Sequence, residues 1–234
     1  MDMPPMSSSQ AKDGWRSAVL EVRKDRAWDL AFYSRVARAY EVWARLAESK
    51  ARRQVVKLAS LKDGEAVLEV AAGTGKQLSN LAQRNPHGRT VGVDLADGML
   101  AAARRRLQRA QLGRVEVQKA DALALPFDDS GFDLVVNCYM LDLLPRDDIP
   151  KALSEFRRVL RPGGRLVLAN MTKAERPWHG LWDALYARGL SLSANCRGVL
   201  AAPVLGELGF HDIGREYIAQ MLFPTEVILA YKPE

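Results

Sequence analysis

The chain has little cysteine and no long apolar run. Its 234 residues include only Cys138 and Cys196, with no Cys-x-x-Cys pair, which argues against a disulfide framework or a zinc site. The start, MDMPPMSSSQ, lacks the charged and apolar regions of a signal peptide. No apolar stretch approaches the roughly 20 residues that a membrane span needs. We therefore expect a cytoplasmic protein with no bound metal.

The overall composition is that of a globular protein with a basic excess. Hydrophobic residues make up 48%, charged residues 26%, and the net charge is +6, so one α/β domain is expected. Such an excess attracts nucleic acid, acidic lipid headgroups or anionic metabolites. Arg104–Arg109 and Arg157–Arg161 carry much of it; we interpret both runs as solvated helix faces, with a binding patch as the alternative. Because no RNA-binding module is visible, we do not expect a nucleic-acid partner. Peripheral membrane contact and a monomer or homodimer stay open.

The chain divides into five segments. Residues 1–14 are polar and rich in Pro and Ser, which predicts a disordered terminus. Residues 15–60 have apolar residues at three- and four-residue spacing, which predicts a helical lead-in that serves as a lid. Residues 61–170 form the predicted cofactor-binding core. Residues 171–200 break its rhythm and are expected to add a second lid. Residues 201–234 complete this single domain as a helix and a hairpin.

Apolar strands alternate with helical segments through the core. Strands are expected at 66–70, 89–93, 114–118, 132–137, 165–170, 210–218 and 224–232, and helices at 75–84, 97–110, 147–160 and 200–208. Strands this apolar predict a parallel sheet covered on both faces. About five residues separate the last two strands, too few for a parallel crossover. We predict a doubly wound α/β fold with seven strands, of which only the last is antiparallel; a nicotinamide-binding Rossmann sheet would usually be parallel throughout.

A glycine-rich turn, Glu69-Val70-Ala71-Ala72-Gly73-Thr74-Gly75, follows the first strand. Glycine allows a sharp turn and close approach of a ligand, although a Gly-x-Gly pair is also found in simple turns. The dinucleotide fingerprint would need glycine at position 78, where this chain has Leu78. Glu69 would repel a diphosphate but suits a ligand that carries ammonium and sulfonium charges. The turn therefore predicts a nucleoside site with a positively charged arm.

Acidic residues follow the next two strands. Asp94 ends the second strand, where a carboxylate can accept two hydrogen bonds from a ribose diol; a cap on the following helix is the alternative. Met99 is a candidate for packing against adenine, or else a core residue. Asp121 and Ala122 follow the third strand, where the carboxylate could accept from an adenine amino group or merely form a turn.

Four segments in order resemble a known family. VLEVAAGTG, VGVDLADGML, ADALALPFDDSGFDLVV and FRRVLRPGGRLVL resemble the successive motifs of class I S-adenosylmethionine-dependent methyltransferases. The group that includes the ubiquinone and menaquinone biosynthesis C-methyltransferases is the most similar. The resemblance runs from about residue 60 to 170. Ala71 stands where many class I enzymes have glycine, a departure that the quinone-type enzymes share.

The resemblance implies S-adenosylmethionine as cofactor and methyl transfer as activity. It implies that Glu69 contacts the methionine end, that Asp94 binds the ribose and that Asn137 lies beside the methionine arm. YSRVARAY (33–40) resembles the lead-in of these enzymes, so Tyr33 and Tyr40 are expected to close the pocket, or else to pack the helix. Motif and resemblance together predict these cofactor-binding residues: Glu69, Ala71, Gly73, Thr74, Gly75, Asp94, Leu95, Met99, Asp121, Ala122, Asn137 and Tyr40.

The methyl acceptor is expected beyond the fourth strand. A sulfonium methyl is already activated, so the protein must mainly position the acceptor and exclude water, and a base is needed only if a proton must leave. Candidate lining residues are Tyr139, Trp178, His179, Trp182, Tyr186 and Cys196. We take His179 and Tyr139 as candidate catalytic residues, although a lone histidine is often structural. The aromatic residues suit a small apolar, quinone-like or lipidic acceptor, or a lid core. A non-catalytic binding protein and an NAD(P)-dependent oxidoreductase are the alternatives.

Overall fold

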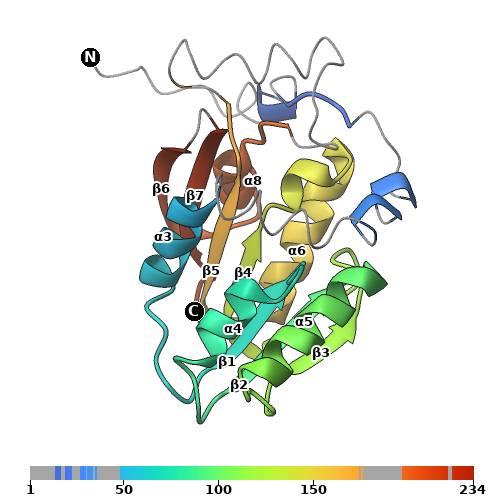
Figure 1. The fold of residues 1–234 in the computed structure, drawn as a ribbon. Coiled ribbons are helices and arrows are strands. Elements are labelled where there is room, and N and C mark those ends of the chain that lie inside the picture. Colours follow the sequence, from blue (N-terminus) through green and yellow to red (C-terminus); the bar gives the residue numbers. More distant parts are fainter. Residues whose placement is uncertain are drawn as a thin grey trace.

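A seven-stranded sheet forms the centre of the molecule (Figure 1). The computed structural model describes residues 14–16, 19–22, 27–29, 31–33, 35, 48–173, 175, 197–220 and 223–234. Its strands are β1 (Ala66–Val70), β2 (Arg89–Asp94), β3 (Glu116–Lys119), β4 (Phe132–Cys138), β5 (Leu160–Met171), β6 (His211–Gln220) and β7 (Phe223–Tyr231). Its helices are α3 (Ser49–Ala59), α4 (Lys76–Ala82), α5 (Asp97–Arg109), η1 (Leu141–Leu143), η2 (Arg146–Asp148), α6 (Ile149–Val159) and α8 (Ala201–Glu207).

The strand order confirms the predicted topology. The order is β3-β2-β1-β4-β5-β7-β6, and neighbours among the first five strands pair in parallel. β7 lies between β5 and β6 and is antiparallel to both. The short connection between β6 and β7 imposes this pairing, because only an antiparallel hairpin can be closed by so few residues.

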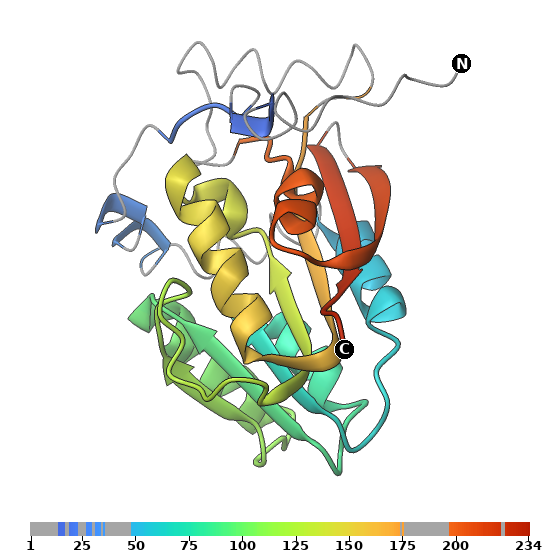
Figure 2. The ribbon, with the colours of Figure 1, turned by 180° about the vertical axis from the view of Figure 1, so that it is seen from behind.

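Helices cover both faces of the sheet (Figures 1 and 2). On one face Val55 of α3 and Leu81 of α4 pack with Leu134 of β4, and α5 lies beside α4. On the other, Phe156 of α6 packs with Val135, and α8 lies on the same side. Neighbouring strand residues point to opposite faces, and both faces are buried, which is why the strands read as continuous apolar runs.

β5 begins earlier than the expected strand at 165–170. Leu160 pairs with Phe132, whereas Arg165 pairs with Leu134, so the register shifts across the Arg-Pro-Gly-Gly stretch. Gly163 has a φ of +66°, and its N–H donates to the carbonyl of Lys232 at 3.1 Å. The two glycines of this stretch therefore lie in an irregularity inside the strand, and Gly163 is bonded to the segment that follows β7.

The predicted helical lead-in is interrupted. Described residues at 14–16, 27–35 and 49–59 are helical, but residues 19–22 are not. The carbonyl of Leu20 accepts a hydrogen bond from the guanidinium of Arg197, 177 positions away. A tertiary hydrogen bond thus takes the acceptor that a continuous helix would use, and the prediction was wrong at this point.

Arg197 ties three segments together from inside the molecule. Its side chain is among the largest that are fully buried. Besides Leu20, the guanidinium donates to the carbonyl of Asp142 at 2.7 Å and to that of Leu144 at 2.6 Å. The N-terminal segment and the loop after β4 are therefore held against the residues that follow 196. Within the described part of the chain, no helix combines the length and apolarity needed to cross a bilayer.

Replacing Arg197 by methionine should destabilise the fold. Carbonyls that accept from the guanidinium would be left buried without partners, so we expect the free energy of unfolding to fall by about 3 kcal/mol or more. Equilibrium unfolding in urea measures the change. Arg114→Met, at an exposed position, is the control and should change stability by less than about 0.5 kcal/mol. Equal stability of the two variants would show that the arginine has no such role.

Candidate active site

A cleft lies at the carboxyl ends of β1, β2, β3 and β4, where open α/β sheets bind ligands. Its empty volume, including open solvent at the mouth, is about 1100 Å³, enough for a nucleoside and a second small molecule. The residues that line it are Asp29, Tyr33, Arg52, Val70, Ala71, Ala72, Gly73, Thr74, Lys76, Asp94, Leu95, Ala96, Met99, Ala120, Ala122, Cys138, Tyr139, Met140, Leu143 and Leu144. The lining is thus mostly apolar, with a few charged groups.

The turn after β1 forms the floor of the cleft. Ala71 and Gly73 both have a φ of +56°, a left-handed conformation that is strained for alanine. No atom lies within 4 Å of the position that a Cβ on Gly73 would occupy, so the space above it is open to a ligand. Gly75 is different, because a Cβ there would lie 2.9 Å from the Cβ of Ala103 on α5. Its lack of a side chain serves helix packing, and its predicted contact with the cofactor stays a prediction.

Asp94 joins the turn after β1 to the loop after β2. Its Oδ2 accepts from the N–H of Gly73 at 2.8 Å, and its Oδ1 accepts from the N–H of Ala96 at 2.9 Å. Burial raises the pKa of this carboxyl, and these amides, with that of Leu95, lower it in part. The alternative role as a helix cap is not found, since Ala96 occupies the N-cap of α5. Each oxygen can accept a further hydrogen bond, and Asp94 is among the residues that line the cleft.

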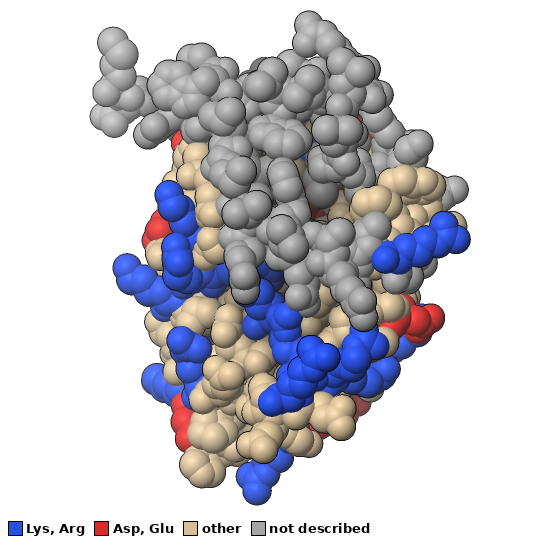
Figure 3. Space-filling model, viewed as in Figure 1, with Lys and Arg blue, Asp and Glu red and all other residues tan. Residues whose placement is uncertain are grey.

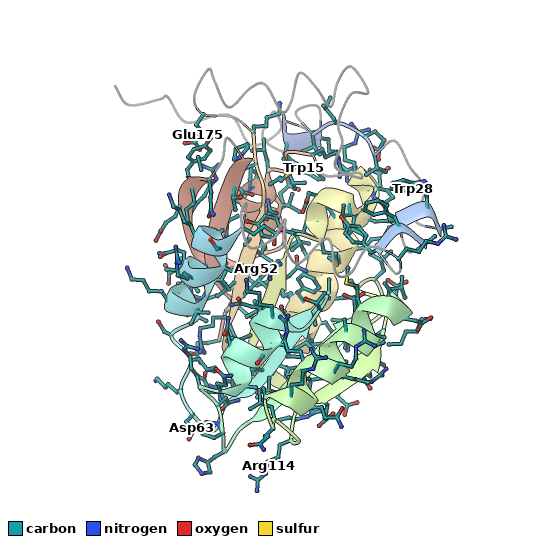
Figure 4. All side chains as sticks on the ribbon, viewed as in Figure 1. Trp15, Trp28, Arg52, Asp63, Arg114 and Glu175 are labelled. Atoms are coloured by element: carbon teal, nitrogen blue, oxygen red, sulfur yellow. The ribbon has the colours of Figure 1, made fainter. Side chains whose placement is uncertain are left out.

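Arg52 and two acidic residues, Glu48 and Glu69, lie at the end of the cleft beside β4. Arg52 of α3, labelled in Figure 4, lines the cleft and donates to Oε2 of Glu48 at 2.9 and 2.7 Å. Its guanidinium also lies over the ring of Tyr139, 5.6 Å from the centroid. Glu69 is fully buried beneath the lining, and neither carboxylate oxygen has a well-formed hydrogen bond among the described residues.

Burial controls the protonation of Glu69. It raises the pKa of this carboxyl to about 8, with the negative charge of Asp94 adding to the rise. The positive charge of Arg52 and the Leu78 amide lower the pKa in part. Near neutral pH the empty site therefore contains a mainly protonated Glu69. A cation placed in the cleft would favour the ionised form.

Two buried amides lie near this end. Asn137 of β4 donates from Nδ2 to the carbonyl of Val70 at 2.8 Å, which leaves its Oδ1 buried without a partner among the described residues. Gln77, in the first turn of α4, is also buried with no partner there for its side-chain amide. Buried polar atoms are normally paired, so these groups are suited to a polar ligand that completes the site.

Tyr139 stands between the cleft and the C-terminal hairpin. It has a φ of +58°, and its hydroxyl is 3.1 Å from Oγ1 of Thr225 on β7. Burial raises the pKa of the Tyr139 phenol well above its usual range, so the phenol stays protonated and is suited to hydrogen bonding, not to act as a base. Burial likewise raises the pKa of the Cys138 thiol to about 12, which excludes a thiolate nucleophile near neutral pH.

The loop after β3 closes the remaining side of the cleft. Ala120 and Ala122 line it together with Leu95 and Met99. The carboxylate of Asp121 accepts from the N–H of Leu123 at 2.9 Å, which is the turn role named as the alternative, and its contact with adenine stays a prediction. The loop is fixed from α6, because Arg158 donates to the carbonyls of Leu125 and Phe127 at 2.9 and 2.7 Å.

Several predicted residues lie outside the part of the chain that the structure describes. They are Tyr40, Trp178, His179, Trp182, Tyr186 and Cys196. Of the predicted cofactor residues, the structure brings Ala71, Gly73, Thr74, Asp94, Leu95, Met99 and Ala122 together in the lining, and places Glu69 and Asn137 directly beneath the same strand ends. Of the two pocket-closing tyrosines, Tyr33 is described and lines the cleft.

Sequence reasoning missed Arg52, Asp29 and the loop after β4. Arg52 is one of several cations on an amphipathic helix, and no local pattern sets it apart from its neighbour Arg53. Asp29 lies in a segment whose position depends on tertiary contacts. Met140, Leu143 and Leu144 line the cleft; their place at the end of β4, beside the predicted Tyr139, was the one available signal.

Comparisons with known proteins agree with this geometry. A family model described as a methyltransferase domain matches residues 67–164. Demethylmenaquinone methyltransferase of Thermus thermophilus is 39% identical over 158 residues, which are 66% of this chain and 70% of that protein. The chain belongs to the class I S-adenosylmethionine-dependent methyltransferases. The predicted family, cofactor and enzyme class are thereby confirmed.

Two further known proteins resemble this methyltransferase, one in sequence and one in fold. The ubiquinone/menaquinone biosynthesis C-methyltransferase UbiE of Paracoccus denitrificans is 34% identical over 182 residues, covering 75% of this chain and 70% of that protein. An S-adenosylmethionine-dependent methyltransferase from Aquifex aeolicus shares the fold, with a TM-score of 0.58 and 19% identity over 89% of this chain and all of that structure. The relative from Paracoccus denitrificans agrees with S-adenosylmethionine-dependent methyl transfer to a small molecule, and the structure from Aquifex aeolicus agrees with the fold.

The buried carboxyl of Glu69 should make stability depend on pH. Its pKa is about 8 in the folded chain and 4.5 ordinarily, so between these values the folded state binds the extra proton and stability falls as pH rises. Relative to Glu69→Gln, the free energy of unfolding should fall by up to about 1.4 kcal/mol per pH unit in this window. Urea unfolding across the window measures it. Glu207→Gln, at an exposed position, should leave the slope unchanged; identical slopes for wild type and Glu69→Gln would contradict a protonated Glu69.

Proposed function

We propose that this methyltransferase binds S-adenosylmethionine along the cleft and methylates an apolar, planar acceptor of the quinone class. The observation that carries the proposal is the placement of one basic and two acidic side chains around the cleft. Arg52 lines the cleft beside Tyr139 and Asp94 lines it at the end of β2, and Glu69 lies buried beneath the lining, where both charges act on its carboxyl. A zwitterionic amino-acid arm joined to a ribose matches this order of groups.

Each end suits one part of the cofactor. The guanidinium of Arg52 is suited to the methionine carboxylate, because arginine pairs with carboxylates in a planar geometry. Glu69 supplies negative charge near the ammonium and sulfonium groups once it ionises. Asp94 can accept from both ribose hydroxyls while it holds the turn, and the open space above Gly73 admits the ligand close to the backbone.

The residues of this chain position the reactants and exclude water. S-adenosylmethionine supplies an activated methyl group on a sulfonium. Met140, Leu143 and Leu144 form an apolar wall beside Tyr139, which would hold a planar acceptor and keep the site dry. Asp29, a carboxylate that is 8% exposed and lines the cleft, is our candidate to take a proton from an acceptor hydroxyl. His179 stays a candidate for the same task.

The acceptor class follows from the relatives and the lining. The named relatives act on demethylmenaquinone or in ubiquinone and menaquinone biosynthesis, and the apolar wall is compatible with such a ring. A charged acceptor would find few partners in this part of the lining. We also propose that residues 15–234 act as a single domain in the cytoplasm, as a monomer or homodimer, with no nucleic-acid partner.

Calorimetry with two forms of the cofactor tests the binding mode. Arg52→Met should weaken the binding of S-adenosylmethionine by at least about tenfold. It should leave the affinity for the decarboxylated analogue almost unchanged, because that analogue lacks the carboxylate. Asp94→Ala should weaken the binding of both forms alike, since both carry the ribose. Arg53→Met, one position along α3 and exposed, is the matched control. Binding of NADH in place of either form would overturn the proposal.

Transfer of a labelled methyl group to reduced demethylmenaquinone tests the acceptor. Wild type should label it, and Asp29→Asn should lower kcat by about 100-fold with little effect on S-adenosylmethionine binding, because general-base catalysis contributes about that factor. Asp97→Asn, on the exposed surface of α5, should keep full activity. Full activity of Asp29→Asn would show that this residue is not the base. Absence of any labelled quinone would overturn the proposed acceptor class.

A further inference from the structure

Basic residues are concentrated on one face of the molecule. Helices α3, α4 and α5 contain nine Lys and Arg but one acidic residue, Asp97, which pairs with Lys119 at 2.8 Å. Helices α6 and α8, on the opposite face, contain three basic and two acidic residues. The fold thus gathers most of the net charge of +6 on one side, where Figure 3 shows a band of basic side chains with few acidic ones.

Six exposed cations define what we call the basic face. They are Lys50, Arg53, Lys57, Arg104, Arg105 and Arg109. Among the described residues, no carboxylate lies within ion-pair distance of Arg53, Lys57, Arg105 or Arg109. Cations without interspersed acids add up to a positive potential that extends into solvent and attracts anionic surfaces. Two other cations of these helices, Arg52 and Lys76, line the cleft, so the positive charge extends from the basic face to the site.

An exposed aromatic side chain lies at the rim of the same cleft. Trp28 is 38% exposed and Leu20 is 43% exposed; they are the exposed large hydrophobic side chains of the described residues. The Trp28 ring stacks on Phe32 with centroids 5.0 Å apart, and Figure 4 shows Trp28 at the edge of the molecule. Asp29 and Tyr33, its neighbours along the chain, line the cleft. One side of this segment therefore faces the site and the other faces solvent.

These features together fit a lipid surface better than a nucleic acid. Helices α3, α4 and α5 contain no aromatic residue, so the basic face offers no platform on which bases could stack. Tryptophan, in contrast, favours the boundary between headgroups and acyl chains, and basic residues favour anionic headgroups.

We propose that the basic face and the Trp28 rim dock this methyltransferase on an anionic bilayer surface, so that an apolar acceptor enters the cleft directly from the lipid. The docking itself rests on the charge and exposure of the described residues. The entry of the acceptor rests on the proposed function. Attachment is reversible and peripheral, because screened headgroup attraction and one or two inserted side chains supply it.

Co-sedimentation of the full chain with lipid vesicles tests the docking. Wild type should bind vesicles of phosphatidylcholine mixed with phosphatidylglycerol, should bind those of phosphatidylcholine alone far more weakly, and should be released by salt. Arg105→Glu combined with Arg109→Glu should lower binding to anionic vesicles at least about tenfold. Trp28→Ala should lower it several-fold, since an exposed side chain can be removed without loss of the core.

A matched double variant controls for net charge. Arg114→Glu combined with Lys151→Glu makes the same change in charge at exposed positions outside helices α3, α4 and α5, and it should keep most of the binding. Equal loss in both double variants, or equal binding to neutral and anionic vesicles, would overturn the proposal. Failure to bind vesicles, together with retention of an RNA oligonucleotide that depends on Arg105 and Arg109, would assign the face to nucleic acid instead.

The same samples separate this proposal from the proposed function. Both double variants should bind S-adenosylmethionine as wild type does, because none of their positions lines the cleft. Vesicle binding without any cofactor binding would leave the docking surface standing and remove the cofactor site. Cofactor binding without vesicle binding would support the cofactor site and overturn the docking surface.

Discussion

The carboxylate of Asp94 makes the interaction on which the site depends. Its two oxygens accept from the backbone of Gly73 and of Ala96, so one side chain joins the turn after β1 to the loop after β2. The turn after β1 contains an alanine in the left-handed region, a conformation that would relax if nothing held it. Because Asp94 lines the cleft as well, the group that shapes the floor is also available to the ligand.

Charge placement gives the cleft its selectivity. Burying Glu69 without a strong hydrogen bond is unfavourable for the ionised form, as the raised pKa shows. Under the proposed function a cationic ligand compensates the ionised form of Glu69, whereas a diphosphate would meet repulsion from Asp94, which lines the cleft. The pairing of Arg52 with Glu48 keeps the guanidinium in place before a ligand arrives, which lowers the entropic cost of binding. A sheet with Rossmann-like connections can therefore favour one nucleoside ligand over another through the charges at its strand ends.

The local sequence pattern was sufficient to predict the strands, which of them is antiparallel, and the cofactor turn. Each of these features is encoded within a few consecutive residues. Short apolar runs, a glycine pair and an acid at a strand end are such local signals. Arg52 has none, since its contact with the cleft depends on how α3 packs across β4 and β5. The pattern located Gly75 and Tyr139 but not their contacts, because Gly75 packs against Ala103 on another helix and the partner of Tyr139, Thr225, is 86 positions away. The interruption at Leu20 could not be predicted either, because a buried arginine from the far end of the chain causes it.

The bond between Tyr139 and Thr225 links the cleft to the last strand of the sheet. The turn after β1 and the loops after β2 and β3 form one part of the cleft, whereas Tyr139, after β4, is joined to the antiparallel hairpin. Substitutions in β7 can therefore alter the surroundings of Tyr139 without touching the turn after β1. On this plan the part of the cleft beside Tyr139 can vary independently of the part that Asp94 holds.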